Sequence, residues 1–194
     1  YGTVAVIGET VTDETLKVIE VTPYRVESTY SDRRHPDQVK FSNKIEDDLK
    51  RRDFTINAMA ASLSKGAIKD IVDLYGGFAD LKAKTIRTVG KPSDRFGEDA
   101  LRLMRAVRLA IALGFTIDKE TLVAIQSQYL LLKDVSRERI RDEFVKILMT
   151  EEPKKGIELL HETGILKQII PELEAGIGVS QPQAHAYDVW EHLL

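Results

Sequence analysis

The stretch that most constrains this chain is FGEDALRLMRAVRLAIAL, which runs from Phe96 to Leu113. Apolar residues recur in it at helical spacing, and after Gly97 it contains neither glycine nor proline. This periodicity predicts a helix over Glu98–Leu113. A three-residue step along a helix turns by about 300° and rises by about 4.5 Å, so residues at this spacing face nearly the same way. Four polar residues follow each other at that spacing: Asp99, Arg102, Arg105 and Arg108.

A carboxylate beside a guanidinium on this helix could recognise a nucleobase. Ionised Asp99 only accepts hydrogen bonds and Arg102 only donates them, so side by side they would form an edge with an acceptor next to a donor. Cytosine and adenine each offer an amino donor beside a ring-nitrogen acceptor, whereas uracil and guanine offer the reverse. The alternative is an ion pair on the helix surface, which stabilises a helix by only about 0.2–0.5 kcal/mol. The stretch alone leaves both interpretations open.

Four motifs occur in one order along the chain. They are LKRRDFTINAMA at Leu49–Ala60, DLYGGFADL at Asp73–Leu81, EDALR at Glu98–Arg102 and ERIRDE at Glu138–Glu143. Together they resemble the class II tRNA nucleotidyltransferases, a family of CCA-adding enzymes, their CC-adding and A-adding relatives, and bacterial poly(A) polymerases. The resemblance extends from about Gly2 to about Gly164.

The resemblance implies an α/β fold followed by an all-α part. Residues 1–87 would be the C-terminal part of a nucleotidyltransferase palm, that is, an N-terminally incomplete head. Residues 88–176 would be the helical neck and the start of a helical body with the base-recognition helix. Residues 177–194 would begin a further helical region, because Gln181–His192 resembles the opening of an HD phosphohydrolase-type domain. Both ends look cut, so we expect a fragment of a longer protein.

The same resemblance assigns nucleotide-binding roles to seven residues. Asp53 and Asn57 would lie near the ribose 2′-hydroxyl and Arg52 on the nucleotide, although an aspartate at a helix start also serves as a simple cap. Asp99 and Arg102 would recognise the base. Arg105 and Arg108 would hold the helix to phosphate or to neighbouring acidic groups.

The chemistry of nucleotidyl transfer requires two metal ions to align the 3′-hydroxyl with the α-phosphate. The family holds Mg²⁺ on paired aspartates of a strand that would precede Tyr1. We therefore expect no catalytic or metal-binding residue in this chain, and we expect the chain alone to be inactive. The parent protein would add C and/or A to the 3′ end of tRNA from CTP and ATP, without a nucleic-acid template.

Two rival functions remain at this stage. Bacterial poly(A) polymerases typically have the sequence Glu-Asp-Pro-Val-Arg in the neck motif. This chain has EDALR there, which favours CCA addition. A non-catalytic module that binds RNA or nucleotides is the other rival. The residues that precede Tyr1 in the parent protein would distinguish an enzyme from such a module.

The amino-acid composition restricts the kinds of metal site, cross-link and membrane segment that the chain can contain, but it says little about the function. The 194 residues include no cysteine and carry a formal net charge of −3, so disulfides and thiolate metal sites are excluded. No apolar run is long enough for a membrane span, and we expect a cytoplasmic protein without a membrane partner. Lys and Arg outnumber Asp and Glu over residues 82–108, a strip that could hold phosphates. The sequence leaves the oligomeric state open.

Local patterns predict the remaining elements. We expect strands over Gly2–Ile7, Leu16–Arg25, Ala67–Val72 and Thr85–Val89. A loop is expected over Val26–Asn43, and a turn or hinge at Gly76–Gly77. Helices are expected over Ile45–Leu49, with Ser42 or Asn43 as its cap, and over Thr55–Leu63, Phe78–Lys82, Pro92–Phe96, Lys119–Leu131, Ser136–Met149 and Lys154–Glu162.

Overall fold

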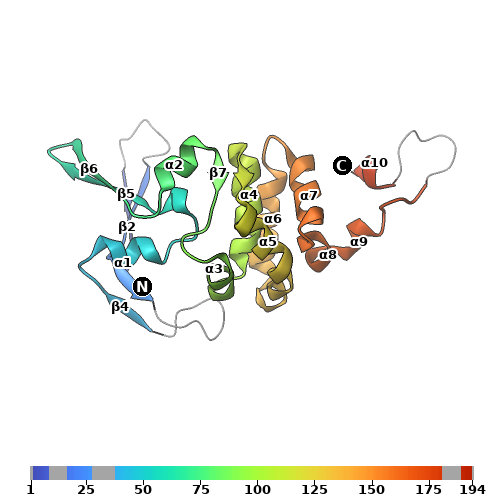
Figure 1. The fold of residues 1–194 in the computed structure, drawn as a ribbon, viewed down its shortest axis with the longest axis horizontal. Helices are drawn as coiled ribbons and strands as arrows, with labels where there is room; N and C mark the ends of the chain where they lie inside the picture. The colour runs from blue at the N-terminus through green and yellow to red at the C-terminus, as the bar shows by residue number, and fades with distance from the viewer. Residues whose placement is uncertain (1, 9–16, 28–37, 181–188, 194) are drawn as a thin grey trace.

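The computed structural model describes residues 2–8, 17–27, 38–180 and 189–193. The molecule is elongated, with strands and short helices at one end and a stack of helices at the other (Figure 1). Apart from the short strand at Thr116–Ile117, the strands of the described residues precede Pro92, and from Pro92 to Glu174 the chain is mainly helical. The predicted fold class, α/β followed by all-α, is confirmed.

The strands between residues 4 and 73 form antiparallel pairs. β1 (Val4–Ile7) pairs with β2 (Val18–Val21), and β3 (Arg25–Glu27) pairs with β4 (Val39–Phe41). The predicted first strand is confirmed. The predicted loop over residues 26–43 is wrong at both ends, because backbone pairing between β3 and β4 makes those ends extended; residues 28–37 lie outside the described part.

The predicted helix over residues 55–63 is wrong. Only one 3₁₀ turn forms, η2 (Thr55–Asn57), and the chain then continues as β5 (Met59–Ser64), which pairs with β6 (Ala67–Asp73). The residues of β5 include good helix formers, but pairing with β6 across the turn at Lys65 and Gly66 satisfies their backbone groups and overrides the helix preference. The predicted strand at β6 is confirmed.

Helix α1 (Ile45–Lys50) forms as predicted, but its predicted cap is wrong. Lys44 occupies the N-cap position without a capping side chain. Ser42 instead accepts a hydrogen bond from the Lys44 backbone N–H at 3.0 Å and donates one to Asp47 at 2.6 Å. The serine therefore shapes the turn before the helix.

The two glycines at the start of α2 (Gly77–Lys82), Gly76 as its N-cap and Gly77 as its first residue, allow it to pack tightly. Gly76 has φ +74°, and a Cβ on Gly77 would lie 2.2 Å from the carbonyl oxygen of Thr55. Asp73 accepts the backbone N–H groups of Gly77 at 2.8 Å and Phe78 at 2.9 Å, which fixes the start of the helix. The predicted turn is confirmed, and it brings α2 against η2.

The segment after α2 joins the two ends of the molecule. β7 (Thr85–Ile86) pairs in parallel with β8 (Thr116–Ile117). Beyond β7, the backbone N–H of Thr55 donates to the carbonyl oxygen of Arg87, and the backbone N–H of Val89 donates to the backbone carbonyl oxygen of Asp53, both at 2.9 Å. The backbone around Asp53 is therefore attached to the chain that leads into the helices.

The predicted helix over residues 98–113 is interrupted. α3 (Pro92–Glu98) ends before Asp99, whose backbone is extended at φ −146° and ψ 105°, and α4 begins afterwards (Leu101–Leu113). The Asp99 carboxylate accepts the Leu101 backbone N–H at 3.1 Å and so offers the chain an alternative to continuing the helix. Asp99 and Arg102 are thus not successive residues on one helix face.

The remaining elements are mainly short helices. They are α5 (Lys119–Gln128), η3 (Tyr129–Asp134), α6 (Arg137–Leu148), α7 (Pro153–Glu162), α8 (Ile165–Ile169), α9 (Pro171–Glu174) and α10 (Val189–Leu193). α6 and α7 match their predictions within two residues. α5 is shorter than predicted because its last turn becomes η3. Residues 181–188 of the HD-like motif lie outside the described part, so that prediction stays untested.

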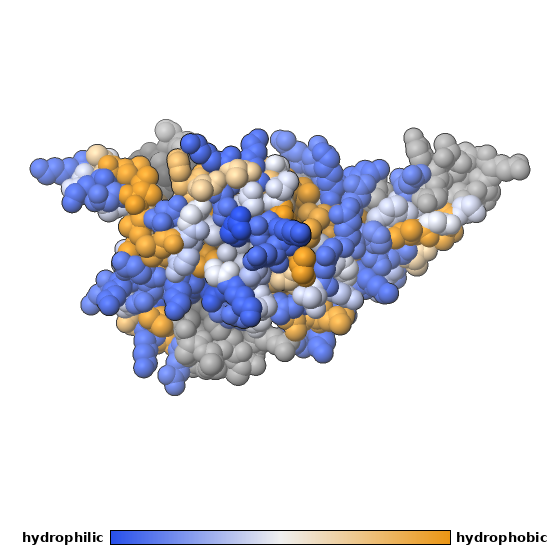
Figure 2. Space-filling model, viewed as in Figure 1, coloured by the Kyte–Doolittle hydropathy of each residue, from blue (hydrophilic) through white to orange (hydrophobic). Residues whose placement is uncertain are grey.

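The core lies in the helical part. Its buried apolar side chains come from Phe96 onward, with Phe54 and Ile86 as the exceptions, and α4 is the central element. In the strand pairs β1–β2 and β5–β6, the large aliphatic side chains are 50–72% exposed, except that of Val72, which is half-buried. Figure 2 shows such hydrophobic surface over the strand end of the molecule.

Candidate nucleotide-binding site

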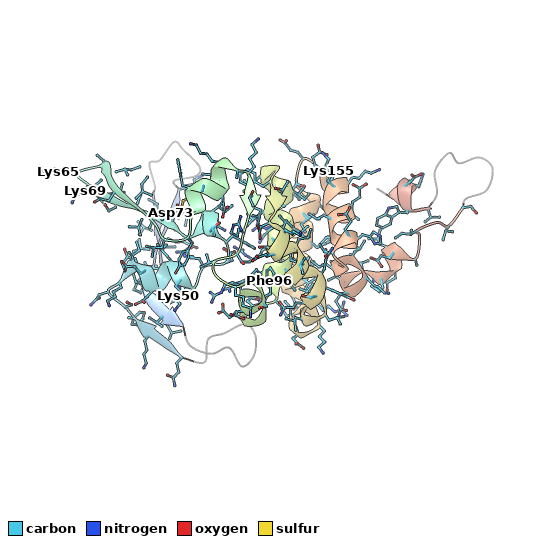
Figure 3. All side chains as sticks on the ribbon, viewed as in Figure 1. Lys50, Lys65, Lys69, Asp73, Phe96 and Lys155 are labelled. Carbon is cyan, nitrogen blue, oxygen red and sulfur yellow. The ribbon has the colours of Figure 1, made fainter. Side chains whose placement is uncertain are left out.

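A pocket of about 540 Å³ lies where the segment after α1 meets α4 and α6. Figure 3 labels one residue on each of two helices beside this pocket: Lys50 at the end of α1 and Phe96 on α3. The Arg95 guanidinium donates to the Lys50 carbonyl oxygen at 3.0 Å and so joins these elements. The pocket is lined by Arg51, Arg52, Asp53, Asn57, Asp99, Leu101, Arg102, Arg105 and Arg139.

Asp53 is buried and carries a full set of donors. One carboxylate oxygen accepts the Phe54 backbone N–H and the Asn57 amide, and the other accepts Nε and Nη2 of Arg105 at 2.8 and 2.6 Å. Burial alone would raise the pKa of Asp53, but the Arg105 charge and these hydrogen bonds hold it below its ordinary value. A carboxylate accepts about four such bonds, so a ribose hydroxyl reaches Asp53 only by displacing one of them.

Asp99 keeps acceptor capacity. One oxygen accepts the Leu101 backbone N–H, and the other forms an ion pair with Arg139 Nη2 at 2.7 Å. About half of its lone-pair sites therefore have no donor within the described part of the chain. Because Asp99 lines the pocket, an amino group of a base could use them.

Arg102 likewise keeps donors while held in place. Its Nη1 donates to Glu98 at 2.6 Å and to the Arg95 carbonyl oxygen, and its Nη2 donates to the Arg51 carbonyl oxygen. Nε and one Nη2 hydrogen have no acceptor among the described residues. Arg102 is therefore a fixed donor at the pocket wall, and its ionic partner is Glu98 rather than Asp99.

The other two predicted arginines differ in position. Arg105 lines the pocket and pairs with Asp53. Arg108 lies outside the pocket and pairs with Glu143 of α6 at 2.7 Å, where Lys146 also reaches that carboxylate. Burial would raise the pKa of Glu143, but the two cations hold it below its ordinary value. The pair joins α4 to α6.

The structure thus brings six of the seven predicted residues to one pocket, with Arg108 behind it. Three residues were missed. All three lie in the four motifs that carry the family resemblance: Glu98 in EDALR, Arg139 in ERIRDE and Arg51 in LKRRDFTINAMA. Their presence in these motifs was the signal that could have marked them as site residues. Their partners lie up to 51 residues away along the chain, and sequence spacing does not reveal such pairs.

The described residues offer no metal site. No group of three or more His, Cys, Asp or Glu side chains within residues 2–8, 17–27, 38–180 and 189–193 is placed to hold an ion. The carboxylates of the pocket are each engaged by arginine. The described residues therefore do not fit Mg²⁺. In the same part of the chain, no helix is both long and apolar enough to cross a membrane.

Sequence comparisons identify the family. Residues 2–87 match the model of the poly A polymerase head domain, and residues 114–177 match the model "probable RNA and SrmB-binding site of polymerase A". The CCA-adding enzyme of Bacillus velezensis is 46% identical over 169 residues, which are 87% of this chain. That of Levilactobacillus brevis is 50% identical over 146 residues, or 75% of the chain. The chain belongs to the family of CCA-adding enzymes and poly(A) polymerases.

Solved structures of this family share the fold. The Bacillus stearothermophilus CCA-adding enzyme in complex with CTP has a TM-score of 0.71 and 39% identity, over 85% of this chain and 37% of that one. A CCA-adding enzyme with ATP has a TM-score of 0.61 and 33% identity, over 66% of this chain and 30% of that one. The chain spans 40% and 36% of the two curated relatives described above.

Proposed function

We propose that the whole protein is a tRNA nucleotidyltransferase that adds C and/or A to the tRNA 3′ end from CTP and ATP. The observation that carries this proposal is the pocket in which Asp99 retains acceptor sites and Arg102 retains donors. The named CTP and ATP complexes of family members support the choice of nucleotides.

The pocket supports recognition of the Watson–Crick edge. Asp99 would accept the amino group of cytosine or adenine, and Arg102 would donate to the adjacent ring nitrogen. Uracil or guanine would place acceptor against acceptor and donor against donor. An unpaired buried polar group costs about 1–3 kcal/mol, so two of them would reject these bases by about a hundredfold.

The residues expected near the ribose differ from the base-recognition pair in that their carboxylate has no acceptor site left over. Because Asp53 is saturated, we propose that Asn57 and Arg105 share ribose recognition with it, and that Arg52 faces the phosphates. Residues 1–87 would form the head, 88–176 the neck and body, and 177–194 the start of a further helical region; the limits of the two family models support the first boundaries.

Primer extension tests this function. The full-length protein is given tRNA that ends before CCA, with each nucleotide separately. We expect incorporation of CTP, ATP or both, and Asp99→Ala should relax the choice among the four nucleotides. Equal slowing with all four nucleotides would instead show that Asp99 acts only through its ion pair with Arg139.

A bacterial poly(A) polymerase is the second candidate, because both family models are named for polymerase A. That enzyme would extend the primer with many adenylates and ignore CTP. For either enzyme, we place the Mg²⁺ ligands outside the described residues and the activity in the cytoplasm. A protein that binds CTP but extends no primer in the presence of Mg²⁺ would be a binding module.

A further inference from the structure

Asp48 is a buried carboxylate that the base and ribose roles above do not use. It lies on α1 behind the pocket, and its side chain is 5% exposed. Its Oδ1 accepts Nε and Nη2 of Arg51, and its Oδ2 accepts Nε and Nη2 of Arg52. One carboxylate therefore holds two consecutive guanidinium groups, each through two hydrogen bonds.

Asp48 is ionised at neutral pH. Burial would raise its pKa, but the hydrogen bonds and charges of Arg51 and Arg52 outweigh burial and keep the pKa below its ordinary value. Two neighbouring guanidinium groups repel each other, and a shared anion offsets that repulsion. Asp48 thus allows both cations to remain together at the pocket wall.

The geometry turns the two guanidinium groups toward the pocket. Both use the Nε and Nη2 edge for Asp48, so their Nη1 ends point away from it. Both residues line the pocket, and the Arg52 side chain is 41% exposed. No described residue accepts a hydrogen bond from Arg52 Nη1. Guanidinium groups presented in this way match the oxygens of phosphate groups.

We propose that Asp48 is a positioning residue that sets Arg51 and Arg52 as a clamp for the triphosphate of the incoming nucleotide. This proposal rests on the nucleotidyl-transfer function proposed above and adds the phosphate end of the same site. A simple charge effect makes the opposite prediction. Removing an anion from the pocket wall would strengthen triphosphate binding, whereas loss of the clamp geometry weakens it.

Calorimetric titration separates these possibilities. CTP and CMP are titrated into the full-length protein with Mg²⁺ and without tRNA. Asp48→Asn should weaken CTP binding by about tenfold, because charge-assisted hydrogen bonds to the β- and γ-phosphates lose their alignment. CMP binding should change by less than about twofold. Glu46→Gln on the exposed side of α1 removes the same charge without touching either arginine, and should leave both affinities nearly unchanged.

Tighter CTP binding by Asp48→Asn, or an unchanged ratio of CTP to CMP affinity, would overturn the clamp. If Asp48→Asn does not fold, Asp48→Glu keeps the charge and moves the carboxylate by one methylene. A folded Asp48→Glu protein with the wild-type ratio would overturn the clamp equally. A wild-type protein that binds UTP as tightly as CTP would refute the proposed function itself, which is a separate outcome.

Discussion

The strand region and the helical region bury their apolar side chains very differently. Apart from Val72, the large aliphatic residues of β1, β2, β5 and β6 are at least half exposed, whereas the helical core side chains are at most 9% exposed. Phe54 precedes the strand β5 in sequence but is fully buried in the helical core. The residue before it, Asp53, is therefore anchored to the helices, and the pocket depends on the helical region more than on the strands.

Phe54→Ala should give the largest effect and break this anchoring. Removing a fully buried phenylalanine costs about 3–5 kcal/mol of unfolding free energy. Urea denaturation of the 194-residue chain measures this loss. A change below about 1 kcal/mol would show that Phe54 is not part of the helical core.

Arg105→Ala should follow, because it leaves the buried Asp53 carboxylate without its cation. Removing one partner of a buried ion pair costs about 3–5 kcal/mol, and since Arg105 is 34% exposed we expect about 2–3 kcal/mol at neutral pH. Exposed Arg141, whose partner is Asp142, provides the control. Arg141→Ala should leave the denaturation midpoint where it is.

The Asp53 pair also predicts a pH dependence. The folded pKa of Asp53 lies below the value in the unfolded chain, about 3.9, so the unfolded chain binds the proton more tightly. The stabilisation is complete above that value and is lost as the pH falls through the lower folded pKa. Wild-type protein should therefore lose stability in acid more steeply than Arg105→Ala. Parallel pH profiles from thermal melts would contradict this.

Gly77→Ala sharpens the comparison at the boundary between the two regions. The added methyl group would meet the Thr55 carbonyl oxygen at 2.2 Å, and forced overpacking costs about 1–3 kcal/mol. No described atom lies within 4 Å of a methyl group placed on Gly97. Gly97→Ala should accordingly be neutral or mildly stabilising in the same thermal melt, and equal losses for both variants would remove the steric argument.

Ile71→Thr should have the smallest effect. Ile71 lies on β6 and is 64% exposed, and threonine retains the branched shape that strands favour. We expect a change within about 0.5 kcal/mol. A loss comparable to that of Phe54→Ala would mean that the strand region has a buried core of its own.

Sequence patterns predicted most of the body helices, and the family resemblance assigned nucleotide-binding roles to Arg52, Asp53 and Asp99, which all line one pocket in the structure. The patterns failed where contacts outside the segment itself decide the outcome. β5 became a strand because β6 pairs with it across a two-residue turn, although its residues also suit a helix. The break at Asp99 contains neither glycine nor proline, and it is fixed by a side-chain hydrogen bond and by Arg139, 40 residues onward. The hydrophobic periodicity of the sequence reveals neither of these two contacts.

The ion pairs of the pocket also order its assembly during synthesis. Asp53 leaves the ribosome 52 residues before its partner Arg105, and Asp99 leaves 40 residues before Arg139. At about 5–20 residues per second, the Asp53 carboxylate waits about 3–10 s for its cation. During that interval it remains hydrated, since burying an unpaired charge is costly. The nucleotide pocket therefore closes only after α4 and α6 have been made, and the head segment docks onto helices that are synthesised later.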